Sequence, residues 1–172
     1  TQAPVPEAEP AGVVKIDFGA LPPPFTLVCT AVRGLTAVEL GRLPSSLRML
    51  AASCLQAQLC VGRASQPPGF WEALLPNEAT RHAVSREHFE VVMEEEGDLA
   101  LVNLSAAGTL VNGARVTDRV PVHAGDLVSI GASLQDSTPI ACFRLALGGD
   151  DKAVPCIATA AAERLLQLAP QI

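Results

Sequence analysis

The chain has 172 residues, of which 49% are hydrophobic and 17% are charged. These values are typical of a globular protein and exclude an intrinsically disordered chain. No apolar run approaches the ~20 residues of a membrane-spanning helix, so no such span is predicted. The formal net charge of −6 argues against nucleic acid as the main partner, because binding to a phosphate backbone needs a high density of Lys and Arg.

The two ends of the chain differ in composition from its middle. Segment 1–24 is rich in Pro and Ala, and because proline favours extended structure we expect a linker or a strap here. Segment 25–147 is predicted to form one domain, followed by a C-terminal extension over 148–172. In that extension apolar residues at helical spacing predict a helix over 157–168.

Within the domain, short apolar and β-branched runs alternate with tight turns that contain Gly. This pattern is typical of an all-β fold, and it predicts an antiparallel β-sandwich with short helical insertions rather than a βαβ fold. Asn112-Gly113 is the strongest local signal for a type I′ hairpin turn. Strands are expected over 25–33, 55–61, 88–93, 98–103, 109–111, 114–116, 127–130 and 140–147.

Two stretches after the first expected strand carry weaker signals. Residues 37–40 are expected to add a second short strand. Over residues 44–54 the apolar side chains follow the i, i+3, i+4, i+7 spacing of an amphipathic helix. An irregular insert between strands is the alternative for this second stretch, and both interpretations stay open.

The connection over 64–84 is long, and long loops in compact domains are usually functional or docking segments. It is expected to hold one short helical turn that includes Phe70 and Trp71, the only adjacent aromatic residues in the chain. A Trp in a long loop can anchor a partner, and it can equally be a plug over the end of the sandwich. Phe70 and Trp71 are therefore candidate partner-docking residues, with the plug as the alternative.

Four short motifs occur in a fixed order on this strand-rich background. They are Gly62-Arg63, then Ser85-Arg86-Glu87-His88-Phe89, then Asn103-Leu104-Ser105-Ala106-Ala107-Gly108-Thr109-Leu110-Val111-Asn112-Gly113, then Gly125-Asp126-Leu127-Val128-Ser129-Ile130-Gly131. Together they resemble the motifs of a forkhead-associated (FHA) domain, a β-sandwich that binds phosphothreonine peptides. The resemblance covers residues 25–147 and is most specific over 61–131.

The resemblance implies a phosphate site built from Arg63, Ser85 and Arg86. A phosphothreonine carries nearly two negative charges and three acceptor oxygens, which a guanidinium can bind with charge-assisted hydrogen bonds. Arg63 is expected to hold the phosphate, with the hydroxyl of Ser85 donating to it and Arg86 adding a second positive contact. Gly62 is expected to let the strand end turn without a Cβ clash.

The resemblance also implies residues that support the site without touching the ligand. His88 is expected to be a buttress that bonds across to the binding loop and fixes its shape, a structural role rather than a catalytic one. Gly108 and Thr109 are expected to set the turn and the strand entry. Asn112 and Gly113 match the family as well, and their turn chemistry explains them completely.

One residue departs from the family pattern. Ala107 stands where the family usually has Asn, whose side chain bonds the peptide backbone beside the phosphothreonine. Ala106, its neighbour, is also small and apolar. Each lost hydrogen bond is worth about 0.5–1.5 kcal/mol, so losing two lowers affinity by roughly tenfold to a hundredfold. We expect phosphate binding to be weakened by Ala107 and not abolished.

Two functions follow from these residues. The first is a non-enzymatic interaction module that binds phosphothreonine-containing proteins through an Arg/Ser pocket. The alternative is an FHA-like structural or scaffold subunit that has lost phosphopeptide binding. It would belong to a larger complex, and an organelle is one place for such a complex. An enzyme is not expected, because the sequence offers no paired acidic residues at usable spacing, no phosphate loop and no plausible triad. No cofactor is implied.

The cysteines bear on metal binding and on the compartment. Five of them occur without a CxxC pair, and the three histidines show no ligand spacing with them, so no metal site is expected. Most lie among apolar neighbours, which predicts buried thiols in a reducing intracellular compartment, the nucleus or cytoplasm. A plastid or mitochondrion is expected instead if the Thr1 start reflects removal of a transit peptide.

Overall fold

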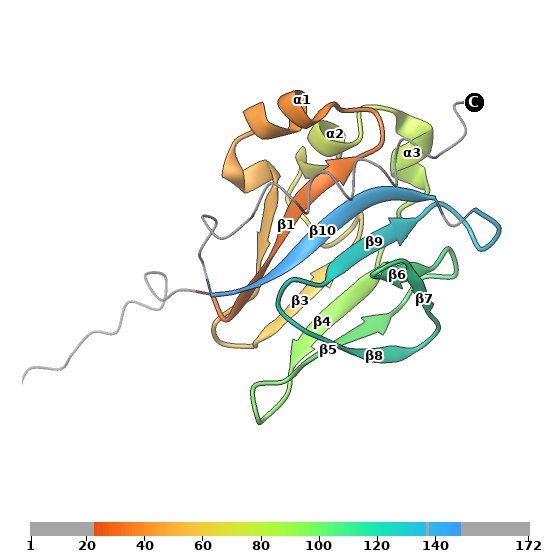
Figure 1. Cartoon of the computed structure of the whole chain (residues 1–172). Coiled ribbons are helices and arrows are strands. Elements are labelled where there is room, and N and C mark those ends of the chain that lie inside the picture. The colour runs from red at the N-terminus through yellow and green to blue at the C-terminus, as the bar shows by residue number, and fades with distance from the viewer. Residues whose placement is uncertain (1–22, 137, 149–172) are drawn as a thin grey trace, which may run out of the picture.

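The computed structural model describes residues 23–136 and 138–148, which form two antiparallel β-sheets (Figure 1). The first sheet contains, in spatial order, β2 (Met49–Ala51), β1 (Phe25–Val32), β10 (Pro139–Leu147), β9 (Leu127–Gly131), β6 (Thr109–Val111) and β7 (Ala114–Val116). The second contains β3 (Gln58–Val61), β4 (Phe89–Met93), β5 (Leu99–Asn103) and β8 (Arg119–Val122). The short helices are α1 (Ala37–Arg42), the 3₁₀ helix η1 (Ser45–Leu47), α2 (Phe70–Leu74) and α3 (Glu78–His82). The predicted all-β antiparallel sandwich is confirmed.

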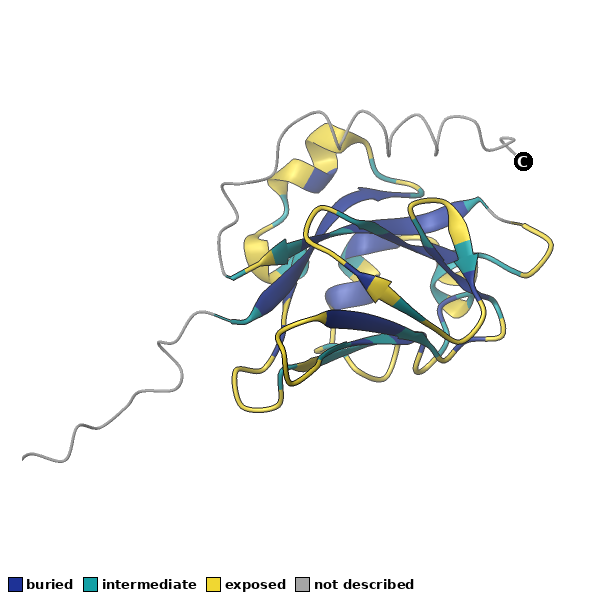
Figure 2. Cartoon of the chain, turned by 60° about the horizontal axis from the view of Figure 1, so that its bottom comes forward, coloured by how far each residue is buried: buried dark blue, intermediate teal, exposed yellow. Residues whose placement is uncertain are grey.

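One core lies between the two sheets. Phe25 and Phe143 of the first sheet and Phe89 and Leu101 of the second are completely buried in the same apolar cluster. Figure 2 shows buried residues along the strands and exposed residues mainly in the connecting turns. Buried strands separated by exposed turns correspond to the short apolar runs and Gly-containing turns of the sequence.

The strand pairing and the hairpin between β6 and β7 agree with the sequence. Asn112 and Gly113 have φ angles of 50° and 83°, and two consecutive positive φ values are what a type I′ turn requires. Gly113 adopts this conformation without strain because it has no Cβ. The turn fixes the register in which Thr109 faces Val116 and Val111 faces Ala114.

The predicted strand over residues 37–40 is wrong, because this stretch is part of helix α1. Thr36 caps the helix: its hydroxyl accepts from the backbone N–H of Glu39 at 3.2 Å, and the Glu39 carboxylate accepts from the Thr36 N–H at 2.8 Å. The hydrogen bond from the Thr36 N–H to the carboxylate lowers the pKa of Glu39, and the Thr36 side chain adds to this effect. The Thr-x-x-Glu pattern of a capping box favours a helix start, and it outweighs the short apolar run that suggested a strand.

The helix considered for residues 44–54 is also wrong, and the irregular insert is correct. The stretch contains η1 and then β2, whose residues Met49 and Ala51 pair with β1. Pairing with an existing strand supplies backbone hydrogen bonds that a short isolated helix cannot match. Strand β3 begins only at Gln58, because Ala57 has a φ of 48° and lies in a turn.

Two elements were not predicted from the sequence. Helix α3 begins after Asn77, whose side chain accepts from the Thr80 N–H at 3.2 Å. Strand β8 contains Pro121, which weakens any strand pattern, but β8 lies at the edge of its sheet, where proline is tolerated. The predicted C-terminal helix over 157–168 lies outside the described residues. None of the helices within 23–136 and 138–148 has the length and apolar character of a membrane span.

The predicted helical turn around Phe70 is present as α2, and it is part of the core. Phe70 and Trp71 are only 1% and 4% exposed, and their rings meet edge to face with centroids 5.1 Å apart. Trp71 also contacts Phe143 edge to face at 6.4 Å, and its Nε1 donates to the carbonyl of Gly62 at 3.0 Å. The plug interpretation therefore holds, and the docking role for Phe70 and Trp71 is wrong, because neither side chain is accessible.

The buried thiols were predicted in part. Cys29 and Cys142 are buried, and burial raises the pKa of both thiols. Cys54, in contrast, is exposed, and Cys60 is half-buried. Thiolate chemistry at Cys29 and Cys142 is disfavoured, because the thiolate is the reactive form.

Replacing Trp71 with Phe should lower the free energy of unfolding by about 0.5–1.5 kcal/mol, because the buried carbonyl of Gly62 loses one of its two donors and keeps the Ser65 N–H. Trp71→Ala should lower it by about 3–5 kcal/mol, since the ring is lost as well. Urea unfolding followed by circular dichroism measures both values. The control is Glu72→Ala, an exposed position on α2, expected to change stability by about 0.5 kcal/mol or less. Equal stability of Trp71→Phe and wild type would show that this hydrogen bond contributes nothing.

Candidate functional site

The candidate residues lie on connections at one end of the sandwich. Strands β3, β5 and β9 end there, and β4, β6 and β10 begin there. The connection 62–88 carries Arg63, Ser85 and Arg86, and the connection 104–108 carries Ala107. The structure thus brings the four predicted ligand-binding residues to the same end of the molecule.

The two ends of the connection 62–88 run side by side. The Arg63 N–H donates to the Ser85 carbonyl at 2.9 Å, and the Ala64 N–H donates to the Arg86 carbonyl at 3.1 Å. A Cβ added to Gly62 would lie 2.1 Å from the Arg86 carbonyl oxygen, so a side chain cannot fit there. Gly62 is required for close backbone approach, which is a stronger constraint than the turn that the sequence suggested.

The Arg63 side chain is exposed and held at one point. Its Nε donates to the carbonyl of Val84, a buried residue on the same connection. This contact orients the guanidinium and leaves its two terminal nitrogens for other acceptors. Arg86 is exposed as well. In the part of the chain that the structure describes, neither Arg63 nor Arg86 takes part in an ion pair.

A chain of hydrogen bonds joins Ser85 to the second connection. The hydroxyls of Ser85 and Ser105 are 2.5 Å apart, and either one can be the donor. The Ser105 hydroxyl also accepts from the Ala107 N–H at 3.1 Å. If Ser105 donates to Ser85, the hydrogen of the Ser85 hydroxyl is left for a ligand. Ser105 was not among the predicted site residues, although it lies within the third motif.

His88 also joins the connection 62–88 to the connection 104–108. Its Nδ1 accepts from the Ser85 N–H at 3.1 Å, and its Nε2 donates to the Gly108 carbonyl at 2.9 Å. These partners require a neutral imidazole with the proton on Nε2. The ring is fully buried, and this burial lowers the pKa of His88, an effect opposed by the bond to Gly108. The contacts are those of the buttress that the family resemblance implies.

The connection 104–108 is shaped by Asn103, which the sequence did not single out. The Asn103 side-chain oxygen accepts from the Ser105 N–H at 3.3 Å and from the Thr109 hydroxyl at 2.9 Å. Its amide nitrogen donates to the Ser105 carbonyl at 3.0 Å. The signal was present, because an Asn that ends a strand before Ser commonly bonds the backbone two residues ahead. Thr109 is buried and acts as a structural partner.

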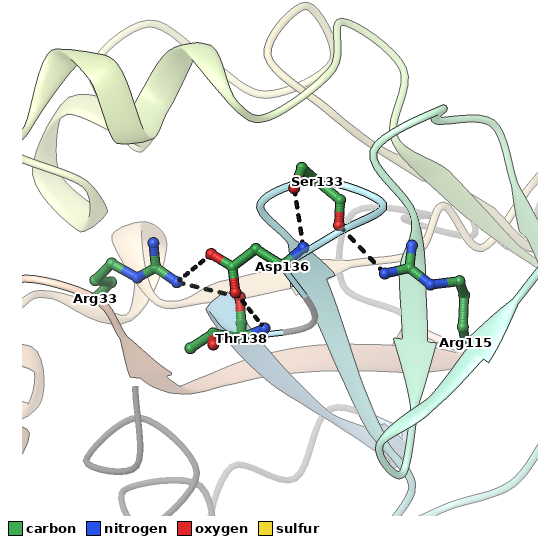
Figure 3. Close-up of polar contacts among 5 residues, drawn as sticks. All are labelled: Arg33, Arg115, Ser133, Asp136 and Thr138. Carbon is green, nitrogen blue, oxygen red and sulfur yellow. Dashed lines mark hydrogen bonds and ion pairs between the residues drawn. The ribbon is translucent and has the colours of Figure 1, made fainter. Parts of the chain in front are cut away.

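Arg115 of β7 braces the same connection and was also missed. Its guanidinium donates to the Ala107 carbonyl at 3.2 Å and to the Ser133 carbonyl in the loop between β9 and β10 at 3.2 Å (Figure 3). Gly108 has a φ of 95°, and a Cβ there would lie 2.0 Å from the Arg115 Nη1. Gly108 is therefore needed both for its backbone conformation and for the space that Arg115 occupies.

A second arginine holds the other side of the loop between β9 and β10. Arg33 donates to the Thr138 carbonyl at 3.1 Å and lies 3.9 Å from the Asp136 carboxylate (Figure 3). The Thr138 N–H donates to the Asp136 carboxylate at 2.9 Å. These hydrogen bonds from Thr138, with a smaller contribution from Arg33, lower the pKa of Asp136. Arg33 and Arg115 thus hold this loop from two sides.

Two predicted support residues lie away from this end. Asn112 and Gly113 form the turn at the opposite end of β6, where the Asn112 amide donates to the Asp126 carboxylate at 3.0 Å. The Leu127 N–H donates to the Asn112 side-chain oxygen at 2.9 Å. They stabilise the fold and have no contact with the candidate site. Within the described ranges, no cluster of His, Cys, Asp or Glu side chains could hold a metal ion.

A model of one domain family matches the part of the chain that contains the connections 62–88 and 104–108. The FHA domain model matches residues 61–131, from the end of β3 to the end of β9. This stretch is similar to the FHA domain family. No match was found among curated proteins.

Several solved structures resemble this one, among them FHA domains. The N-terminal FHA domain of Rad53p from S. cerevisiae, solved with a phosphothreonine peptide, is 21% identical, with a TM-score of 0.47 over 74% of this chain and 94% of that one. The FHA domain of the CT664 protein from Chlamydia trachomatis is 17% identical, with a TM-score of 0.45 over 71% and 95%. Full-length yeast Pml1p is 13% identical, with a TM-score of 0.49 over 71% and 80%.

The buried neutral His88 should make the protein less stable in mild acid. Its folded-state pKa is below the ordinary value of 6.5, so the unfolded chain binds a proton that the folded chain resists. This contribution to stability is complete above about pH 6.5 and is lost as the pH falls towards the folded-state pKa. The free energy of unfolding falls by at most about 1.4 kcal/mol per pH unit through this effect.

Urea unfolding of wild type and His88→Gln between pH 7.5 and 5 isolates this contribution. Groups that titrate alike in both proteins cancel when one curve is subtracted from the other. The difference in unfolding free energy between wild type and His88→Gln should shrink as the pH falls below the pKa of the free imidazole. Parallel curves would show that His88 takes up a proton as readily in the folded state as in the unfolded state.

Proposed function

We propose that this chain binds phosphothreonine-containing proteins through Arg63 and Ser85. The observation that carries the proposal is the exposed Arg63 guanidinium, whose Nε bonds to the carbonyl of Val84, the residue before Ser85, together with a Ser85 hydroxyl that the second connection holds in place. An oriented guanidinium loses little conformational freedom when it binds, so more of its interaction energy appears as affinity. The match of residues 61–131 to the FHA family supports the same ligand class.

The charges at this end of the sandwich suit an anion. Arg63 and Arg86 are exposed, and neither is neutralised by an ion pair within the described residues. Arg33 and Arg119, in contrast, are paired with Asp136 and Glu94. Two unpaired guanidinium groups and a hydroxyl can together bond to several oxygens of a phosphate dianion. Ser85 is half-buried, so its hydrogen bond to a phosphate is partly shielded from water.

A second candidate function rests on the surface of the connection 104–108. Ala106 is exposed and Ala107 is half-buried, and neither side chain can bond to a peptide. A domain that keeps the sandwich without these contacts would serve as a structural subunit of a larger complex. Arg63 and Ser85 favour the first function, because the exposed Arg63 guanidinium takes part in no ion pair within the described residues and the Ser85 hydroxyl is held in place by Ser105.

Replacing Arg63 with Ala should weaken binding of a phosphothreonine peptide by roughly tenfold to a hundredfold. A charge-assisted hydrogen bond contributes about 1.5–3 kcal/mol, and 1.4 kcal/mol corresponds to one decade of affinity. A degenerate phosphothreonine library, with unphosphorylated and phosphoserine libraries as controls, identifies a peptide whose affinity fluorescence anisotropy then measures. The affinity of Arg63→Lys should lie between those of wild type and Arg63→Ala, since lysine keeps the charge but lacks the planar N–H donors of a guanidinium.

The matched control for Arg63→Ala is Arg42→Ala, which removes one exposed arginine from helix α1. Its affinity should equal that of wild type, which excludes an effect of net charge alone. Circular dichroism confirms that each variant is folded. If the folded wild-type protein shows no phosphate-dependent binding, the structural-subunit function is correct. If Arg63→Ala binds as well as wild type, the phosphate site is elsewhere.

Restoring the family residue at position 107 gives an independent test. Ala107→Asn should tighten binding of the same peptide by roughly threefold to tenfold, because one recovered hydrogen bond contributes about 0.5–1.5 kcal/mol. Ala107→Ser, whose side chain is too short to span the same distance, serves as the control. No gain with Asn, measured by the same anisotropy titration, would show that a peptide does not pass beside this loop.

A further inference from the structure

The outer face of the six-stranded sheet is buried, although it points away from the core. In β10 the core residues are Phe143 and Leu145, so Cys142 and Arg144 point the other way. The strand register extends this outer face across the sheet, since Cys142 lies beside Ala31 and Ser129. Side chains on it that are at most 6% exposed are those of Thr26, Val28, Ala31, Leu110, Ser129 and Cys142.

The outer face of the other sheet behaves as expected for a sandwich in water. It carries Gln58, which is exposed and bonds to Glu90 at 2.6 Å, together with exposed Arg119. The outer face of the six-stranded sheet is instead made of small neutral or apolar residues around Leu127, with Arg144 as the charged residue on its central strands. A sheet face of this composition is normally covered by another layer.

The described helices do not supply this cover. Helix α1 contacts β1, but its buried Leu40 belongs to the core cluster between the sheets, with Leu27 and Val32. Within the described residues, Ala31 and Cys142 form a separate apolar cluster against which only Leu127 packs. Arg144 has a buried Nη1 atom without a hydrogen-bond partner, and a buried unpaired donor is unfavourable. The covering layer should therefore bring apolar side chains and an acceptor.

We propose that the C-terminal segment 149–172 is this cover and packs as an amphipathic helix across β1, β10, β9 and β6. The chain leaves the described region at Gly148, directly after β10, which is one of the two central strands of the sheet. Apolar residues at helical spacing, Ile157, Ala161, Leu165 and Leu168, form one continuous stripe in the segment. Asp150 and Asp151 offer carboxylates that can reach Arg144.

The dimensions of the segment fit the face. A helix over 157–168 is about 18 Å long, and the four strands from β1 to β6 span about 14 Å. The eight residues 149–156 can extend to about 27 Å, enough to return from the end of β10 to the middle of the sheet. The N-terminal segment 1–22 is a poorer occupant, because its prolines leave only the eleven residues 11–21 without proline, and two of these are glycines, which disfavour a helix.

Two adjacent leucines provide a matched pair of variants in the full chain. Leu165 lies on the apolar stripe, whereas Leu166 points away from it by a further 100°. Leu165→Lys should release the segment and increase the alkylation rate of Cys142 by N-ethylmaleimide at least about tenfold, because local opening then exposes the thiol. Leu166→Lys should change that rate less than about twofold. Peptide mass spectrometry reports each cysteine separately.

Cys29 distinguishes uncovering from unfolding, because it lies in the core on the inner side of β1. It should remain protected in Leu165→Lys while Cys142 reacts. Unchanged protection of Cys142 in Leu165→Lys would overturn the proposal, as would equal effects of Leu165→Lys and Leu166→Lys. If Cys29 and Cys142 react at the same rate, the whole domain has unfolded in the variant. Methyl contacts in the wild-type chain then decide whether the segment covers the sheet.

Those contacts are measured as nuclear Overhauser effects between leucine and valine methyl groups of the full wild-type chain. Methyl groups of Leu165 and Leu168 should show contacts to Val28 and Leu127. Contacts from Val28 to the valines of segment 1–22 would overturn the proposal in favour of the N-terminus. Contacts found only between differently labelled molecules in a mixed sample would overturn it in favour of a second copy, and an absence of contacts would overturn it outright.

Discussion

The geometry of the candidate site depends on the buried imidazole of His88. It accepts from the Ser85 backbone on one side and donates to the Gly108 backbone on the other, so two connections far apart in the sequence are held at a fixed distance. Only a neutral ring with one donor and one acceptor satisfies both partners, and burial of the ring keeps it neutral by lowering its pKa. The 2.5 Å contact between Ser85 and Ser105 is possible because this distance is already set. A phosphate would meet groups whose positions are determined before it arrives, which reduces the entropy lost on binding.

The connection 104–108 combines a well-held backbone with side chains that offer a ligand little. Asn103, Ser105 and Arg115 together bond to its backbone from inside the domain. The positions that would face a peptide are Ala106 and Ala107, which have no polar side-chain atoms. The scaffold that presents a ligand-binding loop is therefore intact, and the change is confined to two side chains. Under the proposed function, affinity lost in this way would concern peptide-backbone contacts and leave phosphate contacts of Arg63 unaffected, so the two contributions would be physically separable.

The features that could be predicted from the sequence are those whose signals lie in neighbouring residues. Alternating strands, the Asn112-Gly113 turn and the order of the four motifs depend on neighbouring residues, and they gave the sandwich and the end of it that carries Arg63 and Ser85. Two outcomes depend on distant partners: residues 44–54 have helical spacing, yet Met49–Ala51 pairs with β1, and Trp71, for which an anchor and a plug were both open, bonds to the buried carbonyl of Gly62. The strand expected over 37–40 failed for a local reason, the capping box of Thr36 and Glu39. Arg115 could not be recognised from the sequence because its acceptors, Ala107 and Ser133, lie on two other connections.

Strand β10 links the two surfaces of interest without merging them. Its inward side chains, Phe143 and Leu145, complete the core, while Cys142 and Arg144 face the opposite side of the sheet. The loop that precedes β10 is held by Arg33 and Arg115 at the end where the candidate phosphate site lies. A layer over the outer face would therefore stabilise the sheet without occupying the loops, since loops at a sheet end and side chains on a sheet face point in perpendicular directions. Under the proposed function, a phosphopeptide could reach Arg63 whether or not that layer is in place.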